Sequence, residues 1–202
     1  MEQPYIQKHV VIEHHSLYEN GALRFTGASK SSTSEFFLEL YRFLELNYLK
    51  FFKMDMLSKT LFLASEALLE GSGLSHSEAN SHVAMAFYIC HSSLDTDRQF
   101  QATIKSDAFF PSPSLFVYTL PNIALGEIAI RNHFMGENCT FIVPYFDIEH
   151  CISYVNALIS KGYTHVLCGW FNFVDGVEEA KIYLISKEKT DIIFNIINLE
   201  KK

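Results

Sequence analysis

An almost unbroken apolar run, VAMAFYIC, extends from Val83 to Cys90 in the middle of the chain. A strand with apolar side chains on both faces is typical of a sheet that helices cover on both sides. Further strands are predicted at residues 139–143 and 165–171, and a helical pattern over residues 147–161 lies between them. The chain is therefore predicted to be an α/β protein, with a layered mixed β-sheet and helices on both faces.

Other apolar patterns and turn residues predict the order of the remaining elements. The sequence contains no internal repeat, low-complexity tract or linker, so residues 1–202 are expected to form one domain. The further predicted elements are a strand at Val10–Ile12, a loop over Gly21–Thr33, a helix from Ser34 to about Phe52, a helix from near Asp55 to Gly71, helix and loop over Ser92–Ser106, an extended piece bracketed by Pro111, Pro113 and Pro121, a helix over Asn122–Arg131, and strands near 180–186 and 191–198.

Charge and composition exclude several classes of function. The formal net charge of −7 argues against a surface that binds nucleic acid or other phosphates. The apolar runs are shorter than a membrane span and the N-terminal residues lack the apolar region of a signal peptide, so we expect a cytoplasmic protein. Aromatic residues make up 14% of the chain, which indicates a partner surface, an acyl pocket or a compositional bias toward Phe. The cysteines form no Cys-x-x-Cys pair and are expected to be reduced: Cys90, Cys139, Cys151 and Cys168.

Short motifs between Phe109 and Gly162 occur in an informative order. They are Ser112-Pro113, Asn122 four residues before Gly126, Gly136 with Asn138, a strand at Cys139–Val143, and a helix that ends at Gly162. This order and spacing resembles the nucleophile-bearing stretch of the β-ketoacyl synthases of the thiolase superfamily. Lys50 to Ser75, with Met-Asp before an apolar helical run, resembles the early helix of the same family. The resemblance begins near Val10 and matches the N-terminal half of a ketosynthase, so it implies a thiolase-like half.

The position of the family's catalytic cysteine can be counted from two directions. In the family it lies nine residues after the glycine that corresponds to Gly136 and seventeen before the glycine that ends the helix. Counted from Gly136 or from Gly162, both spacings lead to Tyr145. A phenol cannot be the thiolate acyl acceptor of this chemistry, so no catalysis by the chain alone is expected. Tyr145 is either a packed aromatic at a strand end or the plug of a pocket.

The resemblance also implies what a second half would supply. It would bring two active-site histidines, a lysine and a Gly-rich oxyanion loop, and these are expected to lie outside this chain. The helix predicted after Tyr145 has one apolar side and one polar side, whereas the family's helix is sandwiched between two halves. We expect its polar side to meet water or a polar partner, although a surface helix of an unrelated α/β domain would have the same pattern.

Other reactive residues carry weaker signals. His150 and Cys151 are adjacent on a predicted helix, where their side chains diverge by about 100° and cannot form a nucleophile–base pair. His9, His14 and His15 have no acidic or cysteine partner at ligand spacing, so no metal site is predicted. No cofactor is expected.

The leading hypothesis follows from the resemblance. It is a non-catalytic subunit of the chain-length-factor type, similar to short proteins of aryl-polyene and flexirubin-type pigment clusters. Such a subunit would pair with a full-length ketosynthase, or with itself, and would meet acyl carrier protein only through that partner. The dimer strand would comprise Cys139, Thr140, Phe141, Ile142 and Val143. Leu115, Phe116 and Asn122 would approach the partner's acyl tunnel, unless they pack within the chain.

Two other functions remain open. A stand-alone minimal acyltransferase or hydrolase would need Ser153 or a cysteine as its nucleophile, but the sequence has no Gly-x-Ser-x-Gly motif to present a serine. A structural homodimer that has lost the chemistry of a ketosynthase is the third possibility.

Overall fold

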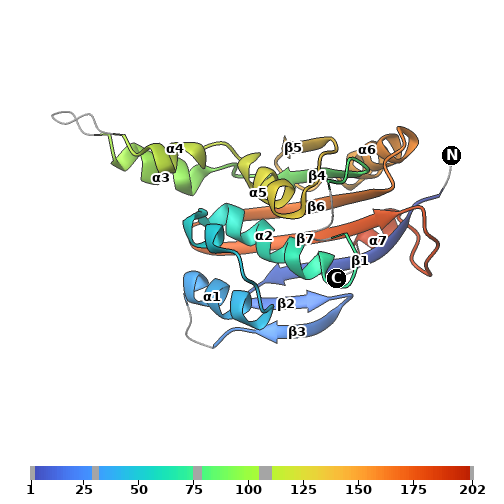
Figure 1. Ribbon diagram of the computed structural model, residues 1–202, viewed down its shortest axis with the longest axis horizontal. Coiled ribbons are helices and arrows are strands. Elements are labelled where there is room, and N and C mark those ends of the chain that lie inside the picture. The colour runs from blue at the N-terminus through green and yellow to red at the C-terminus, as the bar shows by residue number, and fades with distance from the viewer. Residues whose placement is uncertain (1–2, 29–31, 75–78, 105–110, 201–202) are drawn as a thin grey trace.

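A computed structural model describes residues 3–28, 32–74, 79–104 and 111–200 of the chain (Figure 1). The strands are β1 (Tyr5–Glu13), β2 (Ser16–Glu19), β3 (Ala22–Thr26), β4 (Val83–Ile89), β5 (Asn138–Ile142), β6 (His165–Val174) and β7 (Val177–Ser186). The helices are α1 (Thr33–Phe43), α2 (Met56–Leu69), α3 (Leu94–Ala102), α4 (Pro113–Val117), α5 (Ile123–Asn132), α6 (Ile148–Ser160) and α7 (Ile196–Glu200), with a 3-10 helix, η1, at Leu49–Lys53.

The seven strands form one mixed sheet in the order β3-β2-β1-β7-β6-β4-β5. The β1–β2, β2–β3, β1–β7 and β6–β7 pairs are antiparallel, whereas β4 is parallel to both β5 and β6. All seven residues of β4 are buried, because the strand lies inside the sheet and both of its faces are covered. The two edges of the sheet are therefore β3 and β5.

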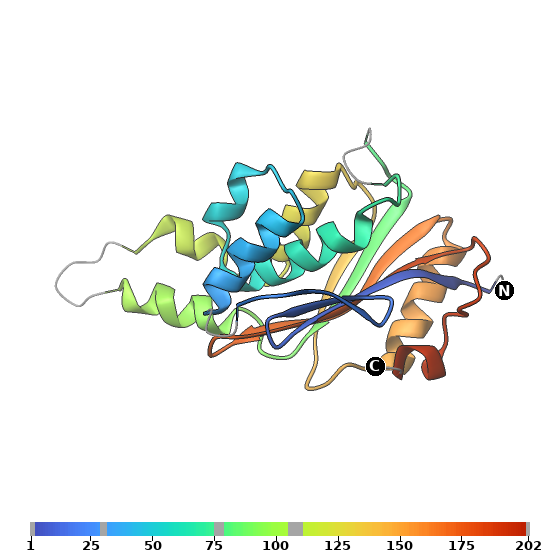
Figure 2. The same cartoon turned by 90° about the horizontal axis from the view of Figure 1, so that it is seen from below.

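Helices cover both faces of this sheet (Figure 2). One face packs against α1, α2 and α5, and its core includes Leu61 and Leu125, both fully buried. The other face packs against α6 and α7 around Cys151 and Val155, which are also fully buried. The prediction of a layered mixed sheet with helices on both faces is confirmed.

Several predicted elements are present near their expected positions. The first strand, the helix after Asp55, the buried strand at 83–90, the helix after Asn122 and the strand–helix–strand sequence from 138 to 174 are all formed. Cys151, Val155 and Ile159 of α6 are buried, while Ser153 and Ser160 are exposed, so this helix has the two-sided character expected of it. Parts of the predictions at residues 29–31, 75, 105–106 and 109–110 lie outside the described residues.

Two predictions in the first sixty residues are wrong. The expected loop over Gly21–Thr33 contains β3, which pairs with β2 beyond a tight turn at Asn20-Gly21. The expected single helix from Ser34 to Phe52 ends at Phe43 and is followed by η1. It ends there because Glu45 adopts a left-handed conformation (φ 51°), and the amides of residues 45 and 46 bond back to the carbonyls of residues 42 and 41.

Two later predictions are also wrong. The piece between Pro111 and Pro121 was expected to be extended, but it contains α4. Ser112 accepts a hydrogen bond from the amide of Leu115, and Pro113 occupies the first turn, where proline is well tolerated. The expected strand at 191–198 makes only a single bridge, from Ile193 to Tyr5, and then becomes α7. A short apolar run does not distinguish strand from helix by its pattern alone.

Candidate functional site

The strand β5 forms one edge of the sheet and pairs with β4 alone. Among the described residues, no segment pairs with its other side, so one row of backbone N–H and C=O groups lies open to a partner strand. Gly136 leads into this strand where a Cβ atom would clash with the carbonyl oxygen of Val83. A glycine at this point of the motif therefore lets β5 lie close against β4.

The side chains of β5 differ in what they contact. Phe141 packs within its own chain, with ring centroids 4.9 Å from Tyr88, 4.9 Å from His150 and 5.0 Å from Tyr154. Cys139 and Val143 are half-buried on the same layer. Because these side chains are occupied inside the chain, they are not the ones that a partner would contact first.

The other side chains of the strand face outward or lack a partner. Ile142 is 59% exposed, although it is a large apolar residue. The hydroxyl oxygen of Thr140 is buried without a hydrogen-bond partner among the described residues. The expected dimer strand is thus an edge strand with a free backbone row, an exposed isoleucine and an unsatisfied hydroxyl.

Tyr145 follows this strand and is 69% exposed. Its side chain therefore neither packs into the core nor plugs a pocket within the described part of the chain. No hydrogen bond or ring contact joins it to a described histidine or lysine. The residue that the motif spacing predicted at the nucleophile position is thus an aromatic side chain at the surface, beside the free edge of β5.

The carboxyl end of β4 lies next to this position and carries Cys90, which the sequence analysis named only as a reduced thiol, and His91, which it did not name. The thiol of Cys90 donates a hydrogen bond to the carbonyl oxygen of Pro144, at 3.6 Å between sulfur and oxygen. The ring of His91 lies 2.8 Å from the side-chain amide of Asn172, from Nδ1 to Nδ2. Clefts at the carboxyl ends of parallel strands are common ligand sites. In the sequence, the signal for this site was a cysteine and a histidine directly after a buried strand.

Cys90 and His91 are hydrogen-bonded to other groups and not to each other. The Cys90 hydrogen bond is made to a backbone carbonyl, and no hydrogen bond joins its sulfur to His91 in the described residues. Cys151 and Cys168 are fully buried on the α6 side, where burial raises the pKa of the Cys168 thiol. Both are thiols of the core.

The helices α3 and α4 form an arm that extends from the body of the protein (Figures 1 and 2). Phe116 is 56% exposed, and its ring lies 5.6 Å from that of Phe100 on α3, between centroids. Leu115 is half-buried, and Asn122, at the start of α5, is exposed and makes no side-chain capping bond. The structure places α5 between this arm and β5. The predicted tunnel residues and the predicted dimer strand therefore lie in two neighbouring regions and do not form one cluster.

Two stretches of the chain, one with α4 and the other with β5, have no charged residues, whereas α3 carries Asp95, Asp97 and Arg98. No Asp, Glu, Lys or Arg occurs from Pro111 to Gly126 or from Asn138 to Phe146. Several large apolar side chains in and near these segments are exposed, namely Phe116, Val117, Leu120, Ile130, Ile142 and Tyr145. Where such residues form a contiguous patch, the patch is often an interaction surface.

The part of the chain that the structure describes contains neither a cluster of metal ligands nor a membrane-spanning helix. No group of three His, Cys, Asp or Glu side chains there could hold a metal ion. None of the described helices has the length and apolar character needed to cross a membrane.

Comparison of the structure with solved structures identifies the fold. The ishigamide ketosynthase/chain length factor superimposes with a TM-score of 0.64 at 16% identity, over 91% of this chain and 62% of that one. This is the fold of the thiolase-like ketosynthases. A β-ketoacyl synthase from Burkholderia phymatum gives 0.61 at 13% identity, over 93% of this chain and 60% of that one.

A third structure is the ketosynthase ApeO in complex with its chain length factor ApeC, from Xenorhabdus doucetiae. It gives a TM-score of 0.58 at 14% identity, over 92% of this chain and 79% of that one. The chain thus spans about three fifths of the length of two of these three ketosynthase-fold proteins. No family model and no curated protein matches its sequence.

Proposed function

We propose that this chain is a ketosynthase-like subunit of the chain-length-factor type, which pairs through β5 with a full-length β-ketoacyl synthase. The observation that carries the proposal is the free edge of β5, with Ile142 and Tyr145 exposed beside it, in a ketosynthase fold. The solved neighbours include ketosynthases together with their chain length factors, which makes a ketosynthase the preferred partner.

The proposed division of labour follows from residue 145. The partner would supply the cysteine, the histidines and the lysine, because a surface phenol cannot carry a thioester. This chain would complete the dimer and close the end of the acyl tunnel, with Leu115 and Phe116 of the arm reaching toward it. Acyl carrier protein would bind through the partner, in an assembly of the polyene, polyketide or fatty-acid type.

The edge pairing can be tested with a matched pair of variants. Ile142 and Leu23 are both 59% exposed and lie on the two opposite edge strands, β5 and β3. Ketosynthases of the same organism would be co-expressed with the chain one at a time, and complexes measured by co-purification and light scattering. Ile142→Lys should weaken the complex about tenfold or more, because a charge would be desolvated at the interface, whereas Leu23→Lys should leave it unchanged.

Three results would contradict this proposal. They are a monomer at high concentration that binds no ketosynthase, equal effects of the two lysine variants, or a complex that Ile142→Lys leaves intact. A wild-type chain that associates only with itself would favour a structural homodimer.

The competing function is a stand-alone acyltransferase or hydrolase, and Cys90 is the specific observation in its favour. Its half-buried thiol lies at the carboxyl ends of the parallel strands, one strand away from residue 145. Turnover of acyl thioesters by the purified chain, abolished in Cys90→Ser, would establish this function in place of the proposed one. We expect no such turnover, because no base is hydrogen-bonded to the thiol.

A further inference from the structure

The α3–α4 arm has little apolar burial to hold it against the body. Thr96 is the only buried residue of α3, and α4 has none among its five residues. A helical segment without a buried apolar face is held mainly by whatever polar contacts it makes. The direction of the arm therefore depends on the bonds at its base.

One of these bonds connects the arm to a buried carboxylate. Tyr118, which caps the C-terminus of α4, donates from its hydroxyl to Oε1 of Glu127 on α5, at 3.1 Å. The other oxygen of Glu127 lies 2.8 Å from the ammonium nitrogen of Lys50 on η1. The side chain of Glu127 is only 4% exposed: Oε1 accepts the hydrogen bond from Tyr118, while Oε2 has the ion pair with Lys50 and no hydrogen bond within the described residues.

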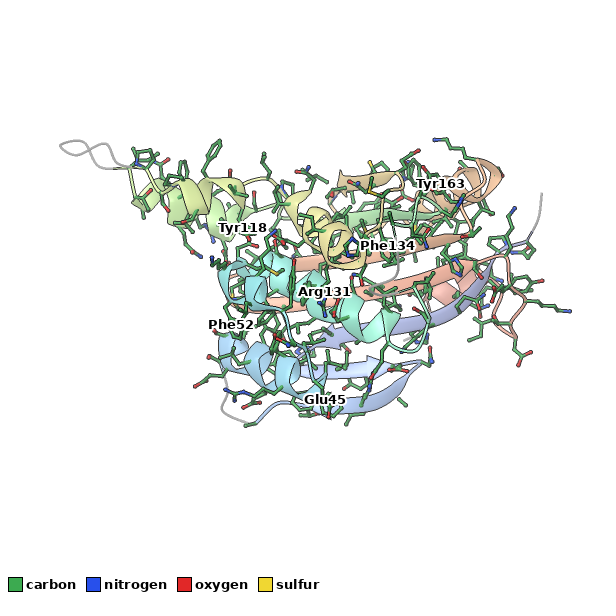
Figure 3. All side chains as sticks on the ribbon, viewed as in Figure 1. Glu45, Phe52, Tyr118, Arg131, Phe134 and Tyr163 are labelled. Atoms are coloured by element: carbon green, nitrogen blue, oxygen red, sulfur yellow. The ribbon has the colours of Figure 1, made fainter. Side chains whose placement is uncertain are left out.

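This connection reaches two parts of the body at once. Lys50 belongs to the 3-10 segment before α2, while α5 is tied to α2 by the pair Arg131–Glu66, at 3.5 Å between nitrogen and oxygen. Tyr118 lies where the arm meets the body, and Arg131 lies farther along α5 (Figure 3). Burial, followed by the charge of Glu127, raises the pKa of Tyr118, so its hydroxyl remains a donor across the ordinary pH range.

The arm also has other polar contacts: Arg98 of α3 pairs with Asp175 at 2.7 Å, and the amide of Ser112 donates to the hydroxyl of Thr103 at 3.2 Å. Ser93 donates to the carbonyl oxygen of Thr119 at 2.6 Å, and Thr96 donates to Asp55 at 2.7 Å, both at the base of α3. Phe116, the exposed aromatic of the arm, is two residues from Tyr118 on the same short helix. Loss of the hydrogen bond of the Tyr118 hydroxyl is therefore expected to change the position of Phe116.

We propose that Tyr118 is a positioning residue, which through Glu127 and Lys50 holds α4 in one direction and so sets where Phe116 meets a partner. The part of this inference that concerns the partner rests on the proposed function. The part that concerns the arm is a property of this chain alone, and the two can be tested separately.

Amide hydrogen exchange on the isolated chain tests the arm. The reporters are the amides of Phe116 and Thr119, which bond to the carbonyls of residues 112 and 116. Tyr118→Phe should raise their exchange rates about tenfold while β4 stays protected, because one hydrogen bond to a charged group is lost at the base. Glu127→Gln keeps an oxygen acceptor for Tyr118, so these amides should remain close to wild type.

A control variant separates positioning from a general loss of stability. Tyr183→Phe also removes a buried hydroxyl, one that donates to the carbonyl oxygen of Leu199 at 3.1 Å on the opposite face of the sheet. It should leave exchange in the arm unchanged. Equal exchange of the arm amides in wild type and Tyr118→Phe, or a uniform rise across the arm and β4, would overturn the positioning role.

The reconstituted pair tests the consequence. With a ketosynthase that binds the wild-type chain, Tyr118→Phe should broaden the distribution of acyl chain lengths without reducing the amount of complex. An unchanged, narrow distribution would show that the direction of α4 does not set product length. If no ketosynthase binds the wild-type chain, the proposed function fails, and the exchange experiment still decides whether Tyr118 holds the arm.

Discussion

At the scale of single residues, position 145 is informative because its environment differs from what a nucleophile needs. A reactive cysteine requires a neighbouring base or positive charge to form the thiolate. Tyr145 is 69% exposed and has no hydrogen bond to a described histidine or lysine. The residue lies shortly after the end of β5, and no local pattern in the sequence could tell whether its ring would be buried.

A new thiol at this position should therefore stay inactive. The Tyr145→Cys variant of the isolated chain should show no malonyl-dependent condensation above the wild type, because no histidine or lysine of the described residues is hydrogen-bonded to residue 145 to activate the sulfur. Labelling with a maleimide would show that the thiol is present and accessible. Condensation that appears in the variant and disappears after labelling would mean that the chain carries an acyl-transfer site of its own.

Cys90 illustrates the opposite limit of sequence analysis. The order of residues does not indicate that residue 90 lies beside residue 144, because this contact depends on the register of β4 against β5. Pairing of strands far apart in sequence is a tertiary property. The apolar strand itself was predictable from composition, whereas the neighbours of its last residue were not.

At the scale of elements, local chemistry decided which predictions were correct. The buried strand β4 and the helix α2, capped by Asp55, have strong signals and are present. The extended piece expected at Pro111–Pro121 is partly the helix α4, because a serine cap and a first-turn proline outweighed the prolines' usual preference for extended backbone. Turn and cap geometry are weaker signals than long apolar patterns, so such short elements are the ones most easily assigned wrongly.

The short helix α4 carries the prediction for product length. In a reconstituted pair, Phe116→Ala should lengthen the dominant product, and a larger residue at Leu115 should shorten it, because each buried methylene contributes about 0.8 kcal/mol to the fit of an acyl chain. Product profiles would be compared by mass spectrometry. Phe43→Ala is a matched control, since Phe43 is 41% exposed and lies on α1, where its ring packs against Phe25 of β3. Identical profiles in both arm variants, with the complex assembled, would contradict a role in chain length.

At the scale of the whole molecule, the pattern of the sheet made the fold easier to predict than the identity of the protein that binds it. Alternating strands and helices indicate an α/β layer structure, and the resemblance to ketosynthases indicated which strand forms an edge. The chain has a net charge of −7, yet residues 111–126, which include α4, and residues 138–146, which include β5, contain no charged residue. A partner's identity depends on the complementary surface, which this sequence does not contain.

Stability of the whole molecule should fall in mild acid because two half-buried histidines resist protonation. Burial, followed by the charge of Lys181, lowers the pKa of His9, and burial lowers that of His165 despite the opposing charge of Glu188. The unfolded chain binds protons near the ordinary histidine pKa of about 6.5, whereas the folded chain binds them only at lower pH. The penalty is therefore absent above about pH 6.5 and grows as pH falls through the lowered pKa values.

Thermal unfolding at pH 7.5 and at pH 5.5 measures this effect. The wild type should have a Tm a few degrees lower at pH 5.5, and the double variant with His9→Gln and His165→Gln should show a smaller difference between the two pH values. His82→Gln, at an exposed histidine, is the control and should behave as the wild type. The lowered pKa values of Glu35 and Glu137 act in a separate window, below their ordinary value of 4.5, and do not affect this comparison. A wild-type Tm that is equal or higher at pH 5.5 would show that these two rings are not protected from protonation in the folded chain.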